Sequence, residues 1–192
     1  MSSGTETVLV VEDERELADL YAAWLTDEYD VRVAYSGAAA LDEMDTDVDV
    51  VLLDRLMPEV SGDEVLDEVR SRGYECPIAM VTAVEPDFDI LELGFDEYIV
   101  KPVRFDDLRE VVASLLMRAT YDTQLQEYFA LVSKRAVLET EKSRHELDSE
   151  PAYETLNERI DTLEDELDET TAELTDRDFE VELRKLGAKT TA

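Results

Sequence analysis

Residues 50–58 read Val-Val-Leu-Leu-Asp-Arg-Leu-Met-Pro, an apolar run that ends on a single carboxylate, Asp54. A short run of this kind is typical of a strand buried on both faces of a parallel sheet. Reactive groups in open α/β sheets collect where such strands end. We therefore expect Asp54 to face a crevice, as a nucleophile or a metal ligand does.

Similar apolar runs recur on both sides of this stretch, and amphipathic patterns separate them. The predicted strands are Thr7–Val11, Val31–Ala34, Val48–Leu53, Ile78–Thr82 and Glu97–Val100. The predicted helices are Glu14–Asp27, Ala38–Met44, Gly62–Ser71, Pro86–Leu93 and one that begins near Arg104. Strands that alternate with helices predict an α/β fold, a doubly wound five-stranded parallel sheet, over residues 1–118.

Residues 119–192 are predicted to form a second, helical domain. Neither Gly nor Pro occurs between Pro102 and Pro151, or between Pro151 and Gly187. Both residues interrupt helices, so their absence indicates long helices with a break near 148–151.

Each long helix carries an apolar stripe. The first stripe is Tyr121, Leu125, Tyr128, Phe129, Val132 and Ala136. The second is Tyr153, Leu156, Ile160, Leu163, Leu167, Thr170 and Leu174, with the alternating steps of three and four that are typical of a coiled-coil seam. An antiparallel hairpin would bury both stripes, whereas a dimeric coiled coil would bury the second against its copy. We favour the hairpin.

The composition is strongly acidic. The 192 residues include 18 basic and 50 acidic side chains, a net charge of −32, and only five of the basic ones are lysines. Such self-repulsion is tolerable where salt screens it, with a Debye length of about 3 Å at 1 M salt. The composition therefore favours a cytoplasmic protein of a salt-accumulating organism and argues against nucleic-acid binding, which depends on Lys and Arg.

Other signals exclude further classes. One cysteine, Cys76, excludes an internal disulfide, and its setting indicates a small apolar residue entering a strand. No apolar run approaches the length of a membrane span, and the N-terminus has no signal-peptide pattern. The single histidine, His145, has only acids around it and is interpreted as a surface residue.

Functional groups follow four of the predicted strands. Glu12, Asp13 and Glu14 follow the first strand, Asp54 follows the third, Thr82 ends the fourth and Lys101 follows the fifth. In a parallel sheet these ends share one edge, so the groups would surround one pocket. Acids are abundant in this chain, and each residue alone could be structural. Together they fit Mg²⁺ bound by oxygen ligands, and a carboxylate nucleophile that accepts a phosphoryl group.

With these residues the chain resembles a CheY-like, flavodoxin-like response-regulator receiver domain. The resemblance implies that Glu12, Asp13, Asp54 and the backbone carbonyl of Leu56 bind Mg²⁺. It also implies that Asp54 accepts a phosphoryl group from a sensor histidine kinase with the help of Lys101 and Thr82, that Thr82 and Tyr98 switch conformation, and that the peptide before Pro102 is cis.

The sequence departs from the family pattern in two ways, and each departure leads to a prediction. Thr82 and Lys101 lie 19 positions apart, fewer than is typical of the family, which predicts a shortened fourth helix between Val84 and Gly94. Leu56 and Val84 flank the line along which water would attack an aspartyl phosphate. Both are apolar and cannot orient water, so we predict a long-lived phosphorylated state.

The second domain resembles the HalX-type helical domain found after receivers of halophilic archaea, through Tyr121–Leu138 and the seam that begins at Tyr153. Residues 119–192 carry 9 basic and 20 acidic residues, a net charge of −11, which predicts an output that does not bind DNA. The expected partners are therefore the histidine kinase, a downstream protein of unknown identity and, for the seam, a second copy of the chain. The long helix would link the two domains mechanically.

Two other functions stay open at this point. One is an adaptor with a vestigial receiver. The other is an aspartyl-phosphate phosphatase of the haloacid-dehalogenase type, which requires a second aspartate where this chain has Leu56. For the favoured function we expect no enzyme activity beyond self-phosphorylation and autodephosphorylation.

Overall fold

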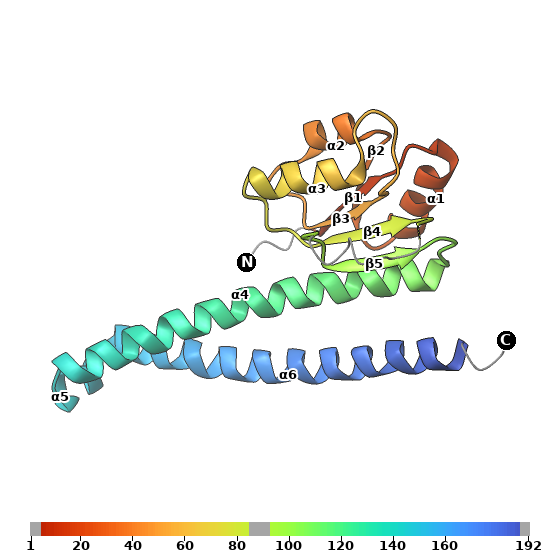
Figure 1. Ribbon diagram of the computed structural model, residues 1–192. Helices are drawn as coiled ribbons and strands as arrows, with labels where there is room; N and C mark the ends of the chain where they lie inside the picture. Colours follow the sequence, from red (N-terminus) through yellow and green to blue (C-terminus); the bar gives the residue numbers. More distant parts are fainter. Residues whose placement is uncertain (1–4, 85–92, 189–192) are drawn as a thin grey trace. The chain divides into compact units, whose positions relative to one another are not determined.

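The computed structural model describes residues 5–84 and 93–188 (Figure 1). It divides into two compact units, residues 1–116 and 117–192. The first unit holds a parallel sheet in the order β2-β1-β3-β4-β5. Its strands are β1 Thr7–Val11, β2 Asp30–Ala34, β3 Val50–Leu53, β4 Ile78–Thr82 and β5 Glu97–Val100. The predicted fold class is confirmed.

The helices of the first unit agree with the sequence patterns to within two residues. They are α1 Arg15–Leu25, α2 Gly37–Glu43, α3 Gly62–Ser71 and the beginning of α4, Phe105–Glu141. All of the predicted helix Pro86–Leu93 except Leu93 falls on residues 85–92, so the helix and its predicted shortening lie outside the described part of the chain.

Alternation along the central strands produces two apolar layers. Leu9, Val11, Val51 and Leu53 pack on one face of the sheet with side chains of α2 and α3. The alternate residues Val8, Val10, Val50 and Leu52 pack on the other face with side chains of α1 and the first turns of α4. Successive side chains of a strand point to opposite faces, so apolar runs are required where both faces are covered. The strand order reverses between β1 and β3, in the central part of the sheet, where β1, β3 and β4 are buried along their whole length.

The predicted strand from Val48 was too long by two residues, and a side chain explains where β3 begins. The Asp49 carboxylate accepts a hydrogen bond from the backbone N–H of Thr7 at 2.7 Å. The Asp49 N–H donates to the Thr7 carbonyl at 2.9 Å. A side chain thus replaces a backbone partner at this point, and the regular ladder starts at Val50.

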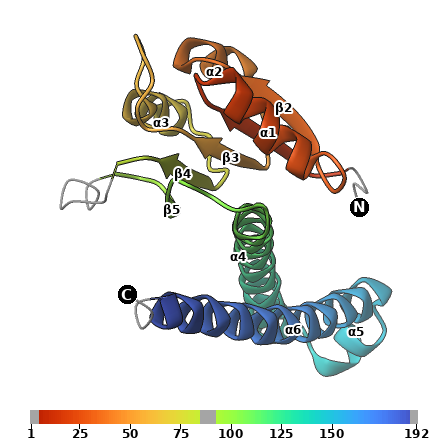
Figure 2. The same ribbon diagram turned by 90° about the vertical axis from the view of Figure 1, so that its right-hand side faces the viewer.

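The second unit contains the rest of α4, a short helix α5 (Arg144–Asp148) and α6 (Pro151–Ala188). Figures 1 and 2 show α5 joining the two long helices at one end. Side-chain bonds between the long helices join Gln124 to Glu166, Tyr128 to Glu164 and Tyr153 to Glu139. The partner number on α6 falls as the number on α4 rises, so the helices are antiparallel and the favoured hairpin is confirmed.

The two predicted stripes have different fates in the hairpin. On α6, Ile160, Leu163 and Leu167 are buried. On α4, Phe129 is 59% exposed and Ala136 is exposed as well. The expectation that the hairpin buries both stripes is therefore wrong for α4, where no residue of the stripe is fully buried. The polar side chains of Gln124, Tyr128 and Glu139 instead form hydrogen bonds with α6. Among the described residues, no helix is long and apolar enough to cross a membrane.

Gly62 gives a test of how tightly the loop after β3 is closed. A Cβ at this position would overlap the backbone carbonyl oxygen of Asp54 and lie 2.8 Å from the Arg55 Cα. Alanine is the better helix former by about 1 kcal/mol. We nevertheless expect Gly62→Ala to lower the free energy of unfolding by about 1–3 kcal/mol, because backbone atoms cannot yield as a side chain can.

The matched control is Gly94→Ala, whose Cβ would meet, among the residues that the structure describes, the Arg70 Cγ alone, at 3.9 Å. We expect this variant to stay within about 0.5 kcal/mol of the wild type. Denaturant unfolding in concentrated KCl measures both variants. Equal stability of Gly62→Ala and the wild type would contradict the close approach.

Candidate functional site

The carboxyl ends of four strands converge at one edge of the sheet. Glu12 and Asp13 follow β1, and Asp54 follows β3, so the three acids lie at the point where the strand order reverses. Thr82 is the last residue of β4, and Lys101 follows β5, with its N–H bonded to the Thr82 carbonyl at 2.8 Å. The crevice at such a reversal is where ligands bind in open α/β sheets.

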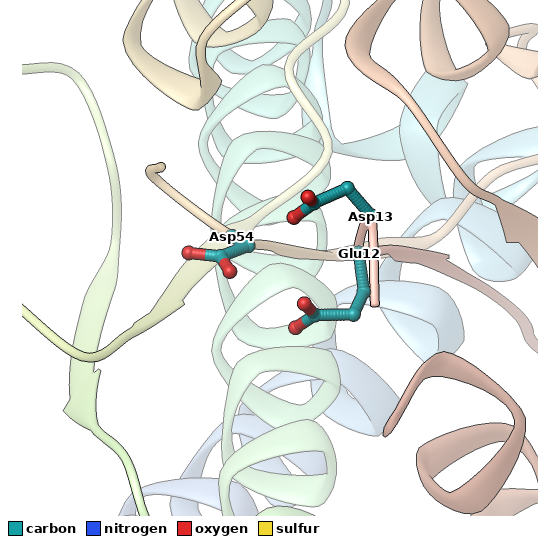
Figure 3. A group of neighbouring side chains, drawn as sticks. All are labelled: Glu12, Asp13 and Asp54. Carbon is teal, nitrogen blue, oxygen red and sulfur yellow. The ribbon is translucent and has the colours of Figure 1, made fainter. Parts of the chain in front are cut away.

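Three carboxylates share this crevice. Glu12, Asp13 and Asp54 each offer an oxygen within 4.8 Å of the others. Figure 3 shows the three acidic side chains next to one another, with those of Glu12 and Asp13 extending toward the side of Asp54. Glu12 and Asp54 are buried, while Asp13 is exposed and leaves the cluster open to solvent.

Lys101 bridges the two buried acids. Its ammonium donates to Glu12 Oε2 and to Asp54 Oδ2, each at 2.6 Å. Burial alone would lower the pKa of Lys101, but the hydrogen bonds and charges of Asp54 and Glu12 outweigh it and raise the pKa above 10.5. Lys101 is therefore a fixed positive charge in contact with Asp54.

One ammonium does not neutralise the cluster. Burial and the charge of Asp54 raise the pKa of Glu12 above 4.5, although the hydrogen bond from Lys101 opposes this shift. Three carboxylates and one ammonium leave a net charge of −2 when all are ionised. Oxygen donors, a net charge of −2 and an open side fit a hydrated divalent cation such as Mg²⁺.

The loop after β3 holds the Asp54 carboxylate from its own side. The Leu56 N–H donates to Asp54 Oδ1 at 3.1 Å, and the Leu56 side chain is 63% exposed. The Gly62 N–H donates to the Arg55 carbonyl at 2.9 Å and closes the loop. Each oxygen of Asp54 thus has one donor, from the backbone at Oδ1 and from Lys101 at Oδ2.

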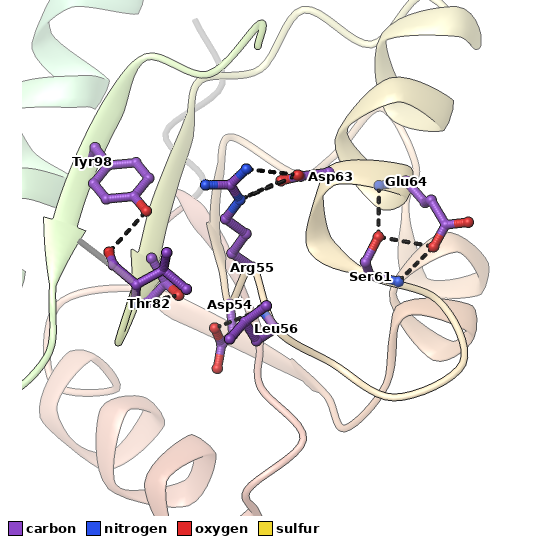
Figure 4. Close-up of polar contacts among 9 residues, drawn as sticks. Asp54, Arg55, Leu56, Ser61, Asp63, Glu64, Thr82 and Tyr98 are labelled. Atoms are coloured by element: carbon purple, nitrogen blue, oxygen red, sulfur yellow. Dashed lines mark hydrogen bonds and ion pairs between the residues drawn. The ribbon is translucent and has the colours of Figure 1, made fainter. Parts of the chain in front are cut away.

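An ion pair that the sequence analysis did not identify braces the same loop. The Arg55 guanidinium donates to both carboxylate oxygens of Asp63, in the first turn of α3, at 3.0 to 3.2 Å (Figure 4). Ser61 and Glu64 form a capping box that begins α3. Opposite charges eight positions apart give no helical or strand signal. Only the loop closure at Gly62 brings them together.

Val84 connects the other two predicted functional residues. Its N–H donates to Thr82 Oγ1 at 3.3 Å, and its carbonyl accepts from the Tyr98 hydroxyl at 3.0 Å. Thr82 is fully buried, and the half-buried Tyr98 ring packs against Phe95 with ring centroids 5.5 Å apart. A displacement of Thr82 would therefore disturb the backbone that holds Tyr98.

The remaining residues singled out in the sequence lie as follows. The Lys101–Pro102 peptide is cis, as the resemblance implied. His145 is exposed on α5, as predicted. Cys76 is half-buried just before β4, and burial raises the pKa of its thiol.

Two family descriptions match this chain. Residues 8–113 match the response regulator receiver domain, and residues 117–183 match the HalX domain. A Haloferax volcanii protein described as a "Putative transcriptional regulator" is 46% identical over 159 residues, which are 82% of this chain and 27% of that protein. The transcriptional regulatory protein DltR of Streptococcus agalactiae is 42% identical over 106 residues, 53% of this chain and 47% of that protein. The chain thus spans less than half the length of these two relatives.

Solved structures match the first unit. The response regulator receiver domain protein (CheY-like) from Methanospirillum hungatei has a TM-score of 0.55 and 25% identity, over 59% of this chain and 94% of that one. The response regulator protein TrrA from Thermotoga maritima, in complex with Mg²⁺ and BeF, has a TM-score of 0.52 and 35% identity, over 58% of this chain and 99% of that one.

Removal of the Lys101 ammonium tests the electrostatics of the site. Lys101→Met leaves two buried carboxylates without their cation, so the free energy of unfolding at pH 7 without divalent cations should fall by about 1–3 kcal/mol. The folded pKa of Lys101 lies above 10.5, so its contribution is complete below pH 10.5 and is lost as the pH rises through the folded pKa.

The difference between wild type and variant should therefore be largest near neutral pH and shrink at strongly alkaline pH. Denaturant unfolding at a series of pH values in concentrated KCl measures it. Lys134→Met, which removes an exposed lysine of α4, is the control and should show no such difference. A difference that stays constant with pH would contradict the bridging role.

Proposed function

The chain belongs to the response regulator receiver family, with a HalX domain after the receiver, and from this premise we propose that Asp54 accepts a phosphoryl group from a sensor histidine kinase in a Mg²⁺-dependent reaction. The observation that carries the proposal is the bond of 2.6 Å from Lys101 to Asp54, beside Glu12 and Asp13. A nucleophile, a fixed cation and a pair of metal ligands are then in one crevice.

Phosphoryl transfer requires the protein mainly to position the reacting groups and to offset the negative charge of the phosphoryl group. An ionised Asp54 oxygen attacks phosphorus, the bond from phosphorus to the histidine nitrogen breaks, and a bond from phosphorus to the Asp54 oxygen forms. Lys101 then offsets the negative charge of the transferred phosphoryl oxygens. Its present bond to Asp54 Oδ2 places the ammonium next to the reacting group before transfer.

Mg²⁺ would be held by Glu12, Asp13, Asp54 and the backbone carbonyl of Leu56, and when bound would offset the repulsion between the carboxylates and an incoming phosphoryl group. The net charge of −2 in the crevice supports this assignment, as does the raised pKa of Glu12, which reflects burial and crowding with Asp54. The Thermotoga relative was solved with Mg²⁺ and BeF. A comparable ligand set is our proposal for this chain.

Phosphorylation would be transmitted through Thr82, Val84 and Tyr98. A phosphoryl oxygen offers the Thr82 hydroxyl a charged acceptor, which is stronger than a neutral partner. If Thr82 turns toward it, the hydrogen bond from the Val84 N–H is lost, and the Val84 carbonyl that now receives the Tyr98 hydroxyl shifts. The phosphorylated and free forms would then differ in the position of Tyr98.

We propose that the output acts through protein contacts and not through DNA. The net charge of −11 over residues 119–192 opposes approach to phosphate backbones. The Haloferax relative is described as a transcriptional regulator, and a helical hairpin could serve such a role through a protein partner. The acidic composition supports a cytoplasmic location in a salt-accumulating cell.

The phosphatase alternative is disfavoured by the residue two places after Asp54. That position holds Leu56, whose exposed side chain has no group able to exchange a proton with a leaving alcohol. We therefore propose that the chain has no enzyme activity beyond its own phosphorylation and dephosphorylation. The vestigial-adaptor alternative is tested by the phosphorylation experiment itself.

Acetyl phosphate with Mg²⁺ in concentrated KCl should add about 80 Da, one phosphoryl group, to the wild type in intact-mass measurements. Asp54→Asn should stay unmodified. Asp13→Asn should need about tenfold more Mg²⁺ for the same yield, because a ligand is lost. Glu14→Gln is the matched control, since it removes the neighbouring acid outside the carboxylate cluster and should behave as the wild type. Modification of Asp54→Asn, or an equal yield in EDTA, would refute the proposal.

The lifetime of the phosphorylated form tests the roles of Leu56 and Val84. Water must be oriented in line with the bond that breaks, and two apolar side chains leave it without a hydrogen-bonding partner. After removal of acetyl phosphate, the added mass should persist far longer than seconds. Leu56→Gln should shorten this time and Leu56→Met should not. Decay of the wild type within seconds would show that this explanation is wrong.

A further inference from the structure

The loop between β3 and α3 carries one of the proposed metal ligands on its backbone. The peptide group between Arg55 and Leu56 is held at both of its polar atoms. Its N–H donates to Asp54 Oδ1 at 3.1 Å, and its carbonyl accepts from the Gly62 N–H at 2.9 Å. The next carbonyl along the chain, that of Leu56, is the one proposed to bind Mg²⁺. Because peptide groups are planar, its direction follows from this fixed peptide and the two backbone dihedral angles of Leu56.

The Arg55 side chain ties this peptide to α3. Its Nε and Nη2 atoms donate to the carboxylate of Asp63 at 3.0 to 3.2 Å, in a bidentate arrangement (Figure 4). A planar guanidinium paired in this way is fixed in direction as well as in distance. The Arg55 side chain is only 12% exposed, so water and salt screen this pair less than they screen a surface ion pair.

Asp63 lies in the first turn of α3, which is itself well anchored. In the capping box the Glu64 N–H donates to Ser61 Oγ at 3.3 Å, and the Ser61 N–H donates to Glu64 Oε2 at 2.9 Å (Figure 4). Hydrogen bonds from the Ser61 N–H and hydroxyl lower the pKa of Glu64 below 4.5, so the box is complete at neutral pH. The helix, and not the loop, therefore determines where Asp63 offers its carboxylate to Arg55.

We propose that Arg55 and Asp63 are positioning residues for the metal: their ion pair holds the loop so that the Leu56 carbonyl is directed for binding Mg²⁺. The inference rests on the proposed function, since it requires Mg²⁺ in the crevice. Mg²⁺ demands near-octahedral geometry with ligands at about 2.0–2.1 Å, so a carbonyl on a loosely held loop would be a poor ligand. Residues that orient ligands in this way contribute to metal affinity without touching the metal.

The charge of Arg55 by itself would have the opposite effect. Arg55 is a cation next in sequence to Asp54, so removing it should strengthen the binding of a divalent cation if charge decides. If position decides, removing it should weaken that binding. The sign of the change in affinity for Mg²⁺ therefore separates the two explanations.

The test is isothermal titration calorimetry of the full chain with Mg²⁺ alone, in concentrated KCl and without a phosphodonor. Arg55→Met should raise the dissociation constant for Mg²⁺ by about tenfold. Arg55→Lys should raise it too, because lysine keeps the charge but cannot form two parallel hydrogen bonds. Arg72→Met is the matched control: Arg72 pairs with Glu68 at the other end of α3, and its loss changes the net charge equally. Its dissociation constant should equal that of the wild type.

Two further measurements distinguish positioning from a general loss of structure. Asp63→Asn should also weaken Mg²⁺ binding, and combining it with Arg55→Met should add little, since both variants break the same pair. In the metal-free protein, Arg55→Met should speed hydrogen exchange at the Leu56 and Gly62 N–H groups by a larger factor than exchange in β3. A loss of global stability alone would speed exchange in β3 by the same factor.

The outcomes separate this proposal from the proposed function. An unchanged or stronger affinity of Arg55→Met for Mg²⁺ would overturn the positioning role and leave the proposed function standing. A wild type that binds Mg²⁺ but gains no mass from acetyl phosphate would contradict the proposed function alone. A wild type that binds no Mg²⁺ would overturn both.

Discussion

The contact of Lys101 with Glu12 and Asp54 is the constraint around which the first unit is organised. Its two bonds of 2.6 Å tie the residue after β5 to the residues after β1 and β3. Two buried carboxylates side by side would repel each other in a poorly solvated site, and one ammonium between them makes their proximity tolerable. The negative charge that remains is what would attract the proposed divalent cation, so the interaction that stabilises the site does not neutralise it.

The first unit was largely predictable because one physical rule determines several features at once. A strand buried on both faces must be apolar throughout, and its end in a parallel sheet must meet the ends of its neighbours. Val50–Leu53 therefore predicted both the core and the position of Asp54. The ion pair between Arg55 and Asp63 could not be predicted in this way. The pair forms because the loop after β3 folds back at Gly62. The sequence shows that a glycine is present there, but not that it lies against the backbone of Asp54 and Arg55.

The second unit was less predictable. An apolar stripe indicates that one face of a helix is buried, but it does not indicate which element covers that face. Three residues of the α6 stripe, Ile160, Leu163 and Leu167, are buried, whereas no residue of the α4 stripe is, although both stripes follow helical spacing. The hairpin is instead held on the α4 side by long polar side chains, such as Arg159 of α6, which donates twice to Glu127 at 2.8 and 2.9 Å. Acidic side chains are abundant in this chain of 50 acidic residues, so polar contacts of this kind can hold the hairpin together while apolar side chains of α4 such as Phe129 stay exposed.

The backbone and the side chain of Val84 have separate roles near the crevice. The hydrogen bonds to Thr82 and from Tyr98 both use its backbone, so they are the same for every residue type except proline, which lacks the N–H. Its side chain, by contrast, is free to vary, and in the proposed chemistry it helps to decide how soon water reaches the phosphoryl group. A substitution at this one position could therefore change how long a signal lasts without changing how it is transmitted. Duration and transmission would be independently adjustable, and a family of such regulators could differ in timing while sharing one switch.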